Sequence, residues 1–167
     1  MFTIYNGPMP TTASQLGVST GTGILTLLQI LPTKRCRILE WGVSFAGAAV
    51  AAGVEVELLD TAAVFATVTA SVDADIHKVD NGSIAASTAG LTLANAGNSY
   101  LATGYTASAE GTVAATRILD AGYITPTNWF HRTFATPREA VIGNSTRIRF
   151  KAGTGVLAIC YMTIELP

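Results

Sequence analysis

The feature that most constrains the fold of this chain is a two-residue alternation of polar and apolar side chains in several short segments. Residues 146–151 read Thr-Arg-Ile-Arg-Phe-Lys, and residues 54–60 read Val-Glu-Val-Glu-Leu-Leu-Asp. Successive side chains of a β-strand point to opposite faces of the sheet, so both patterns predict half-buried strands. Because Glu55 and Glu57 then share one face, we expect them to meet solvent or cationic partners.

Other segments carry weaker forms of the same signal. Residues 156–165 are apolar on both faces, which is typical of a strand covered on both sides, and in a sandwich the second cover can be another subunit. The composition of residues 107–121 favours a helix, but Gly111 and the β-branched residues favour a strand. In residues 37–45 we expect four side chains to point into the core: Leu39, Trp41, Val43 and Phe45. Further strands are expected in residues 24–31, 64–70, 100–106 and 113–119, and a loop from Pro137 to Asn144.

Short strands separated by turn signals about every ten residues, without a convincing amphipathic helix between them, are typical of an antiparallel sandwich or barrel. We therefore predict an all-β fold, a single antiparallel β-sandwich of jelly-roll type over residues 24–167. A chain of 167 residues buries roughly 70% of the surface that its unfolded form exposes, so this domain needs no disulfide or metal to fold.

Residues 1–23 predict an extended N-terminal arm outside the sandwich. The segment holds Gly7, Pro8 and Pro10, followed by a run rich in Thr, Ser and Gly. Proline cannot donate to a β-ladder, and glycine weakens one. Such a terminal segment is either disordered or pinned along a neighbouring subunit, and we expect its removal to leave the fold intact.

The chain is poor in charge, which bears on its partners. Only 13% of its residues are charged, about half of the roughly 25% that is usual in soluble domains. Ala, Thr, Ser and Gly replace charge on the surface, and such a surface costs little to desolvate. Depletion of charge is typical of the centre of protein–protein interfaces. The net charge of −1 offers no basic excess to nucleic acid, which we do not expect as a partner.

Several other functional classes find no support in the sequence. No run of about 18 apolar residues predicts a membrane-spanning helix, and the first five residues lack the pattern of a secretory signal. Cys36 and Cys160 lie far apart in apolar segments and are expected to be reduced core thiols, although a disulfide stays open. Asp73, Asp75 and His77 would share one face of a strand, but without a complete ligand set they predict a solvated polar face. We therefore expect no metal and no cofactor.

The segment 129–138 is the candidate contact surface, because aromatic and cationic side chains are favoured as anchors of protein interfaces. A catalytic histidine needs a nucleophile or an orienting carboxylate beside it, and the sequence cannot place such a partner next to His131. No nucleophile-elbow motif is present either, so we expect no catalytic site and no enzyme activity. An alternative role for Trp129 and Phe130 is to close one end of the core. The candidate interface residues are Trp129, Phe130, His131, Arg132 and Arg138.

Residues 34–45, 54–59, 105–112 and 147–150 together resemble segments of the jelly-roll capsid decoration, or cement, proteins of tailed bacteriophages. The resemblance spans residues 34–165 and lies in strands rather than in a catalytic signature. It implies a structural virion protein made in the bacterial host cytoplasm. On the outside of the phage head, such a protein forms a homotrimer that braces the contacts between major capsid proteins.

Other roles stay open. Jelly rolls also host lectins, so the chain could be a receptor- or glycan-binding module of a fibre or tail, with Trp129 or Tyr123 at the glycan. It could instead be another virion structural component, such as a tail protein or a main coat protein. A deep pocket with convergent ionisable groups would favour an enzyme.

Overall fold

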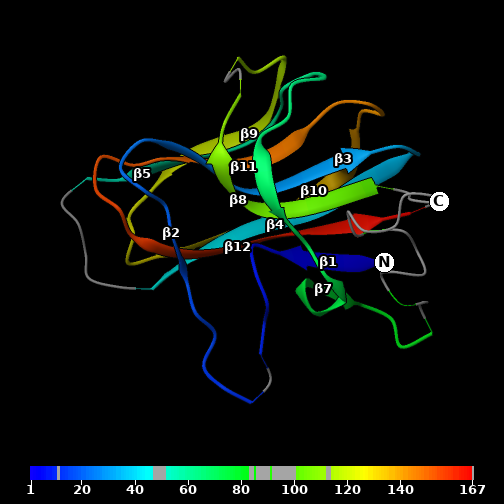
Figure 1. Cartoon of the computed structure of the whole chain (residues 1–167), viewed down its shortest axis with the longest axis horizontal. Coiled ribbons are helices and arrows are strands. Elements are labelled where there is room, and N and C mark those ends of the chain that lie inside the picture. Colours follow the sequence, from blue (N-terminus) through cyan, green and yellow to red (C-terminus); the bar gives the residue numbers. More distant parts are fainter. Residues whose placement is uncertain are drawn as a thin grey trace.

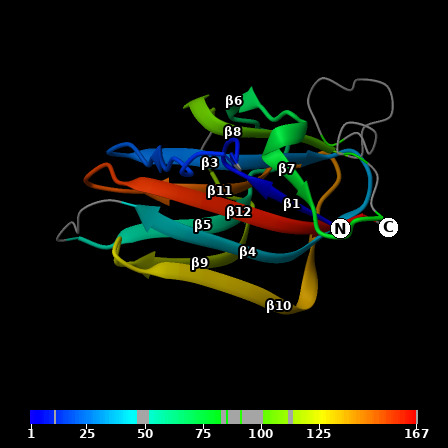
Figure 2. The same ribbon diagram turned by 90° about the horizontal axis from the view of Figure 1, so that it is seen from below.

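Two antiparallel sheets packed face to face form the molecule (Figures 1 and 2). The computed structural model describes residues 1–10, 12–46, 52–82, 85, 91, 101–111 and 114–166. Within these ranges there is no α-helix, and the one helical element is the 3₁₀ turn η1 (Asp73–Asp75). The predicted all-β sandwich is confirmed.

Each sheet contains six strands. Sheet A has the order β10-β4-β12-β1-β7, and β2 pairs with β12 as well. Its strands are β1 (Phe2–Tyr5), β2 (Val18–Ser19), β4 (Cys36–Ala46), β7 (Ile76–Lys78), β10 (Trp129–Ala140) and β12 (Leu157–Glu165). Sheet B has the order β6-β8-β3-β11-β5-β9. Its strands are β3 (Ile24–Pro32), β5 (Val54–Asp60), β6 (Thr67–Ala70), β8 (Leu101–Ala109), β9 (Arg117–Ile124) and β11 (Thr146–Lys151).

Long stretches of the chain alternate between the two sheets. Strands β3, β4 and β5 lie in sheets B, A and B, and strands β9 to β12 lie in sheets B, A, B and A. As a result β11 lies between β3 and β5, while β4 lies between β10 and β12. Crossing from sheet to sheet in this way is the jelly-roll type of connection. It brings strands from distant parts of the sequence side by side.

The inward faces of the two sheets share one hydrophobic core. The alternation in β5 and β11 is confirmed, because Val56, Leu58, Ile148 and Phe150 are fully buried. Burial of a side chain of this size stabilises the fold by about 1.5–3 kcal/mol. Both cysteines are free thiols in this core, as predicted, and burial raises the pKa of Cys36 to about 12.

A β-bulge in β4 reverses part of the predicted alternation. The register of β4 against β12 shifts between Glu40 and Ile38, which leaves Leu39 as the extra residue. An extra residue moves the side chains on one side of it to the opposite face. The core therefore takes both Ile38 and Trp41, while Leu39 is partly exposed. The prediction that Leu39 points inward is wrong.

The first residues of the chain belong to the sandwich. Strand β1 lies between β12 and β7, and its Phe2 and Ile4 are part of the core. Asn6 fixes the end of this strand, since its side-chain nitrogen donates to the Ala158 carbonyl (3.1 Å) and its side-chain oxygen accepts from the Cys160 N–H (2.9 Å). The prediction of an arm over residues 1–23 is wrong, because the alternation Phe-Thr-Ile-Tyr outweighs the Gly and Pro residues that follow it.

Between β1 and β2 the chain forms the loop that projects below the sheets in Figure 1. Residues 12–16 of this loop are exposed, and Leu16 is 80% exposed. The chain returns to the sheet at β2, which pairs with Leu157 and Ala158 of β12. Both ends of the projecting loop are therefore held by the same strand, β12.

The second half of the chain confirms one prediction and corrects another. Strands β8 and β9 occupy both ends of the 107–121 segment, so the strand interpretation is confirmed there. The predicted loop from Pro137 is wrong, because β10 continues to Ala140 and the turn follows it. Proline is tolerated on edge strands and at bulges. Pro137 meets both conditions, since β10 is an edge strand whose register shifts between Thr133 and Arg138.

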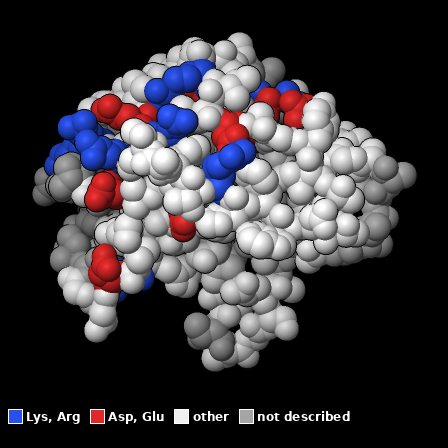
Figure 3. Space-filling view, turned by 180° about the vertical axis from the view of Figure 1, so that it is seen from behind, with Lys and Arg blue, Asp and Glu red and all other residues white. Residues whose placement is uncertain are grey.

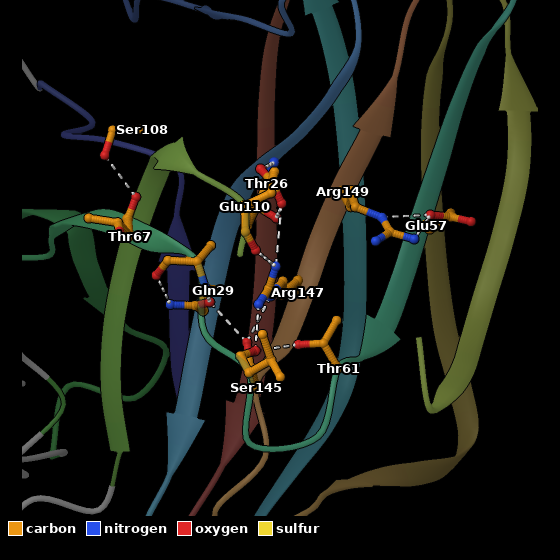
Figure 4. A network of polar contacts seen from close by, with 12 residues as sticks. Thr26, Gln29, Glu57, Thr61, Thr67, Ser108, Glu110, Ser145, Arg147 and Arg149 are labelled. Atoms are coloured by element: carbon orange, nitrogen blue, oxygen red, sulfur yellow. Dashed lines mark hydrogen bonds and ion pairs between the residues drawn. The ribbon is translucent and has the colours of Figure 1, made fainter. Parts of the chain in front are cut away.

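A buried polar network lies on the outer face of sheet B (Figure 4). The Arg147 side chain is fully buried there and pairs with the Glu110 carboxylate at 3.3 Å. Its guanidinium also donates to Ser145 Oγ (2.9 Å), to the Glu110 carbonyl (3.0 Å) and to the Val64 carbonyl. The Glu110 carboxylate accepts from the N–H and the hydroxyl of Thr26. These bonds attach the segments around Val64 and Glu110 to β3 and β11.

The acidic residues of β5 find cationic partners on the same face, as predicted. Glu57 accepts from Arg149 (3.0 Å) and from Lys151 (2.9 Å), and Lys151 also donates to Glu55 (3.2 Å). Burial raises the pKa of Glu57, but the hydrogen bonds and charges of Lys151 and Arg149 outweigh this effect and leave the pKa lowered. This carboxylate therefore stabilises the fold at neutral pH, and its contribution is lost as the pH falls through the lowered value.

We expect Ile4→Ala to lower the free energy of unfolding by about 2–5 kcal/mol, because it leaves a cavity in the core. The matched change Leu16→Ala, on the exposed loop, should stay within about 0.5 kcal/mol of the wild type. Urea unfolding followed by circular dichroism measures both values. If the two variants were equally stable, β1 would not be part of the cooperative domain.

We expect Glu110→Ala to cost about 3–5 kcal/mol, because it leaves the buried Arg147 without its counter-charge. The double variant Glu110→Ala/Arg147→Met removes both charges and should recover a large part of that loss. The same unfolding measurement applies to both variants. Additive losses in the double variant would contradict the coupling between these two side chains.

Candidate functional site

The predicted contact residues lie on β10, the edge strand of sheet A, and its alternation divides them between two faces. Trp129, which is 73% exposed, and His131 point to the outer face. Phe130 packs against Trp41 at a ring-centroid distance of 5.0 Å, and Arg132 donates to Asp120 of β9 (3.0 Å). Phe130 thus helps to close the core, which is the alternative role that the sequence offered for it. Trp129 faces outward instead.

Arg138 lies apart from the other predicted residues. It follows the register shift in β10, and its guanidinium carbon lies 5.1 Å from the centre of the Phe134 ring. The side chain is exposed. In the part of the chain that the structure describes, β10 pairs only with β4, so its other edge has no strand partner. Near Arg138, Arg117 of β9 donates to the Glu139 carbonyl of β10 (2.6 Å).

A row of rings crosses the outer face of sheet A, and we call it the aromatic row. Each ring lies within 5.4–6.3 Å of the next between centroids. The row crosses sheet A from β10 over β4, β12 and β1 to β7. This path spans four strand spacings, or about 19 Å. In order, its members are Trp129, His131, Tyr161, Tyr5 and His77.

Gly42 of β4 makes room for the middle of this row. It lies in register with both His131 and Tyr161, so a side chain at this position would stand between their rings. A Cβ placed on Gly42 would come within 2.6 Å of Tyr161 Cε1 and 2.9 Å of its hydroxyl oxygen. The Tyr161 ring therefore lies over the β4 backbone at Gly42, where it is half-buried.

Polar side chains lie one row further along the same face, and we call them the hydroxyl row: Thr133, Glu40, Thr163 and Thr3. Glu40 connects the two rows, because its carboxylate binds His131 Nε2 (3.1 Å) and accepts from Thr163 Oγ1 (2.9 Å). Thr163 Oγ1 in turn lies 3.0 Å from Thr3 Oγ1.

Burial, and next the Glu40 carboxylate, raise the pKa of Tyr5 and of Tyr161. Both phenols therefore stay protonated at neutral pH and can donate hydrogen bonds.

The two rows carry little charge. Glu40 is the one carboxylate among the described residues of the aromatic and hydroxyl rows, and neither row contains Lys or Arg. Charged residues come on the far side of the β4 bulge, where Arg37 lies in register with Glu139 and Glu165. The face is thus aromatic and hydroxylated in its middle and charged at one end.

The sequence identified only the β10 end of this surface. Tyr161 and Tyr5 went unnoticed because the sequence does not show which strands lie beside β12 and β1. The alternation in residues 156–165 places Tyr161 on one face with Leu157 and Ile159, and that signal marked a second covered face. The meeting of Tyr5 with Tyr161 across 156 positions, in contrast, requires the register of β1 on β12.

The three residues considered as possible metal ligands, Asp73, Asp75 and His77, do not form a metal site. In the described part of the chain, no group of three potential ligands is close enough to hold a metal ion. Asp73 and Asp75 lie in η1, and His77 lies in β7. The prediction of a solvated face is wrong for Asp75, which is fully buried. One oxygen of Asp75 accepts from the Val72 N–H (2.8 Å), while the other, with His77 Nε2 and Ser71 Oγ, is buried without a protein partner.

A hollow of about 290 Å³ lies between the projecting loop and β8. Its lining is mostly apolar and contains one titratable side chain, Tyr105. No helix within the described ranges has the length and apolar character to cross a membrane.

Comparison with protein-family models, curated proteins and solved structures found no match to this chain. The outer face of sheet A is therefore interpreted from its own geometry.

We expect Asp75→Asn to stabilise the protein increasingly as the pH rises from 4 to 8. Burial raises the pKa of Asp75, although the Val72 N–H and His77 act in the opposite direction. Because the folded state binds this proton more tightly than the unfolded state, stability is lost as the pH rises through the raised pKa. An asparagine carries no such cost and still accepts from Val72. Melting temperatures at several pH values measure the effect.

Asp80→Asn is the matched control for this prediction, because the Asp80 side chain is 65% exposed and its one ion pair among the described residues, with the N-terminal amine, is long at 4.0 Å. Its melting temperature should follow that of the wild type at every pH. A stabilisation of Asp75→Asn that is the same at pH 4 and pH 8 would contradict the role given to ionisation of Asp75.

Proposed function

We propose that this protein is a structural, non-catalytic virion component: a decoration, or cement, protein that binds the outside of a phage capsid as a homotrimer. The observation that carries the proposal is the low charge of the chain: only 13% of its residues are charged, and many of them pair with one another. The proposed site of action is the capsid surface, after synthesis in the bacterial host cytoplasm.

Many of the charged side chains form ion pairs with one another within the chain. The described ion pairs include Arg147–Glu110, Arg149–Glu57, Lys151–Glu55, Arg117–Asp60 and Arg132–Asp120. Figure 3 shows most charged side chains over the upper and left parts of one side of the molecule, while the described residues at the lower right of that view carry none. A neutral surface of small side chains loses little hydration energy on contact, so it suits extended protein–protein contacts.

The segments that resemble the decoration proteins support the same proposal. They fall on strands of the sandwich, namely β4, β5, β8 and β11. What they share with that family is therefore a pattern of strands, which is consistent with a role in packing and contact. A capsid gains stability from any protein that binds its assembled form and not its separate subunits.

The open edge of β10 is the proposed contact between copies. An unpaired strand edge is a template for association, and identical subunits normally close into rings. Trp129, Arg132 and Arg138 lie along this edge, and residues of these types are the usual anchors of interfaces. The second partner in this proposal is the major capsid protein.

Light scattering behind a sizing column tests the self-association. The wild type should show a mass three times that of the 17.3 kDa chain. Trp129→Ala/Arg138→Ala should shift the mass towards the monomer, because it removes two exposed anchors of the β10 edge. Val72→Ala, at an exposed position outside that edge, should leave the mass unchanged. A wild-type monomer at high concentration would contradict the homotrimer in solution.

The place of the chain in the virion has its own test. Quantitative mass spectrometry of purified particles of the encoding phage should find a copy number of the same order as that of the major capsid protein. Far fewer copies would indicate a tail or fibre component. Absence of the chain from the particles would refute the proposal.

A further inference from the structure

We propose that the outer face of sheet A binds a neutral carbohydrate chain along the aromatic row. This activity does not depend on the proposed role in a capsid. It rests on three features of the face: the orientation of its rings, the hydroxyl row beside them, and the absence of cationic side chains from both rows.

The rings offer stacking surfaces of a kind that sugars use. Tyr161 lies over Gly42 and is half-buried, and the open end of the row is Trp129, which is 73% exposed. The face of an aromatic ring carries partial negative charge, and the C–H groups on one side of a pyranose ring carry partial positive charge. Tyrosine and tryptophan also lose little conformational entropy on contact, because each has few rotatable bonds.

The polar groups lie where the edge of a stacked sugar would meet them. Glu40, with 31% of its side chain exposed, lies beside His131, and Thr163 lies beside Glu40. Thr163 is buried and donates to Glu40, so it holds the carboxylate in place. Sugar hydroxyls both donate and accept hydrogen bonds, so they can donate to the part-exposed Glu40 carboxylate. A few fixed polar groups next to an apolar surface give orientation and specificity to a ligand.

The charges of the face exclude other ligand classes. A phosphate backbone or an acidic polymer needs Lys or Arg, and the two rows contain neither. Arg37, further along the face, lies in register with the carboxylates Glu139 and Glu165. A dry contact with a second protein copy would cover Glu40, and its only ion-pair partner on the face is a histidine. Burying a carboxylate at the centre of an interface is costly, and such centres are depleted in Glu. The span of about 19 Å suits a short oligosaccharide lying across the strands.

A glycan array and affinity electrophoresis in gels that contain neutral polysaccharides test the proposal on the full-length chain. Hydroxyethylcellulose, galactomannan, xylan and glycogen are suitable polymers. At least one neutral glycan should bind the wild type, whereas the anionic polymers polygalacturonate and heparin should not. Tyr161→Ala and Tyr5→Ala should each weaken binding about tenfold, which corresponds to the loss of one ring contact.

Two further variants separate a binding role from a structural one. Gly42→Ala keeps every ring but forces Tyr161 off the strand, so it should also weaken binding. Tyr123→Ala removes a tyrosine that is 79% exposed on β9, outside the row, and should bind like the wild type. Circular dichroism melts establish that each variant is folded.

Three results would overturn the proposal: no neutral glycan binds the wild type, Tyr161→Ala and Tyr5→Ala bind as well as the wild type, or only anionic polymers bind. A fall in the mass of Tyr161→Ala by light scattering, without a change in glycan binding, would assign the face to contact between copies and also overturn it. If Trp129→Ala/Arg138→Ala does not change the mass, that result contradicts only the proposed homotrimer contact. The carbohydrate proposal is tested separately, since Tyr161 and Tyr5 lie on β12 and β1.

Discussion

The ion pair between Arg147 and Glu110 is the interaction on which the arrangement of sheet B depends. Strand β11 turns its apolar side chains into the core, so its cationic side chains must lie on the outer face. Arg147 is fully buried there, and a buried cation is tolerated only with a counter-charge and filled hydrogen bonds. Glu110, Ser145 and the Val64 carbonyl supply both. The segments that follow β5 and β8 are thereby held against β3 and β11.

This use of charge explains the different character of the two sheets. The outer face of sheet B carries the ion pairs of Glu57 with Arg149 and Lys151. The outer face of sheet A carries rings and hydroxyl groups, with Glu40 as the carboxylate of its two rows. A chain with only 13% charged residues has few charges left after the first face is built. The second face is thus available for contacts that need little desolvation of charge, whether with protein or with carbohydrate.

The two proposals share Trp129 and otherwise use different parts of sheet A. The edge of β10 has unpaired backbone groups and offers a contact to another copy, whereas the middle of the sheet is fully paired and offers only side chains. Strand β1 matters to the second surface, because it places Tyr5 beside Tyr161. Asn6 and the core residues Phe2 and Ile4 hold that strand in position. The N-terminal residues therefore contribute both to the core and to the candidate binding face.

The sequence alone determined the all-β class and the inward residues of β5 and β11, because a two-residue period is a local property of the chain. It favoured reduced cysteines without excluding a disulfide, and it left Glu55 and Glu57 to meet either solvent or cationic partners. It could not place Leu39, since a bulge depends on the partner strand, and it misjudged Phe2–Tyr5, since four residues carry too weak a pattern. Of the candidate surface it located only Trp129 and its neighbours. The aromatic row was decided by the tertiary structure, because its rings meet through the register between strands that are distant in the sequence.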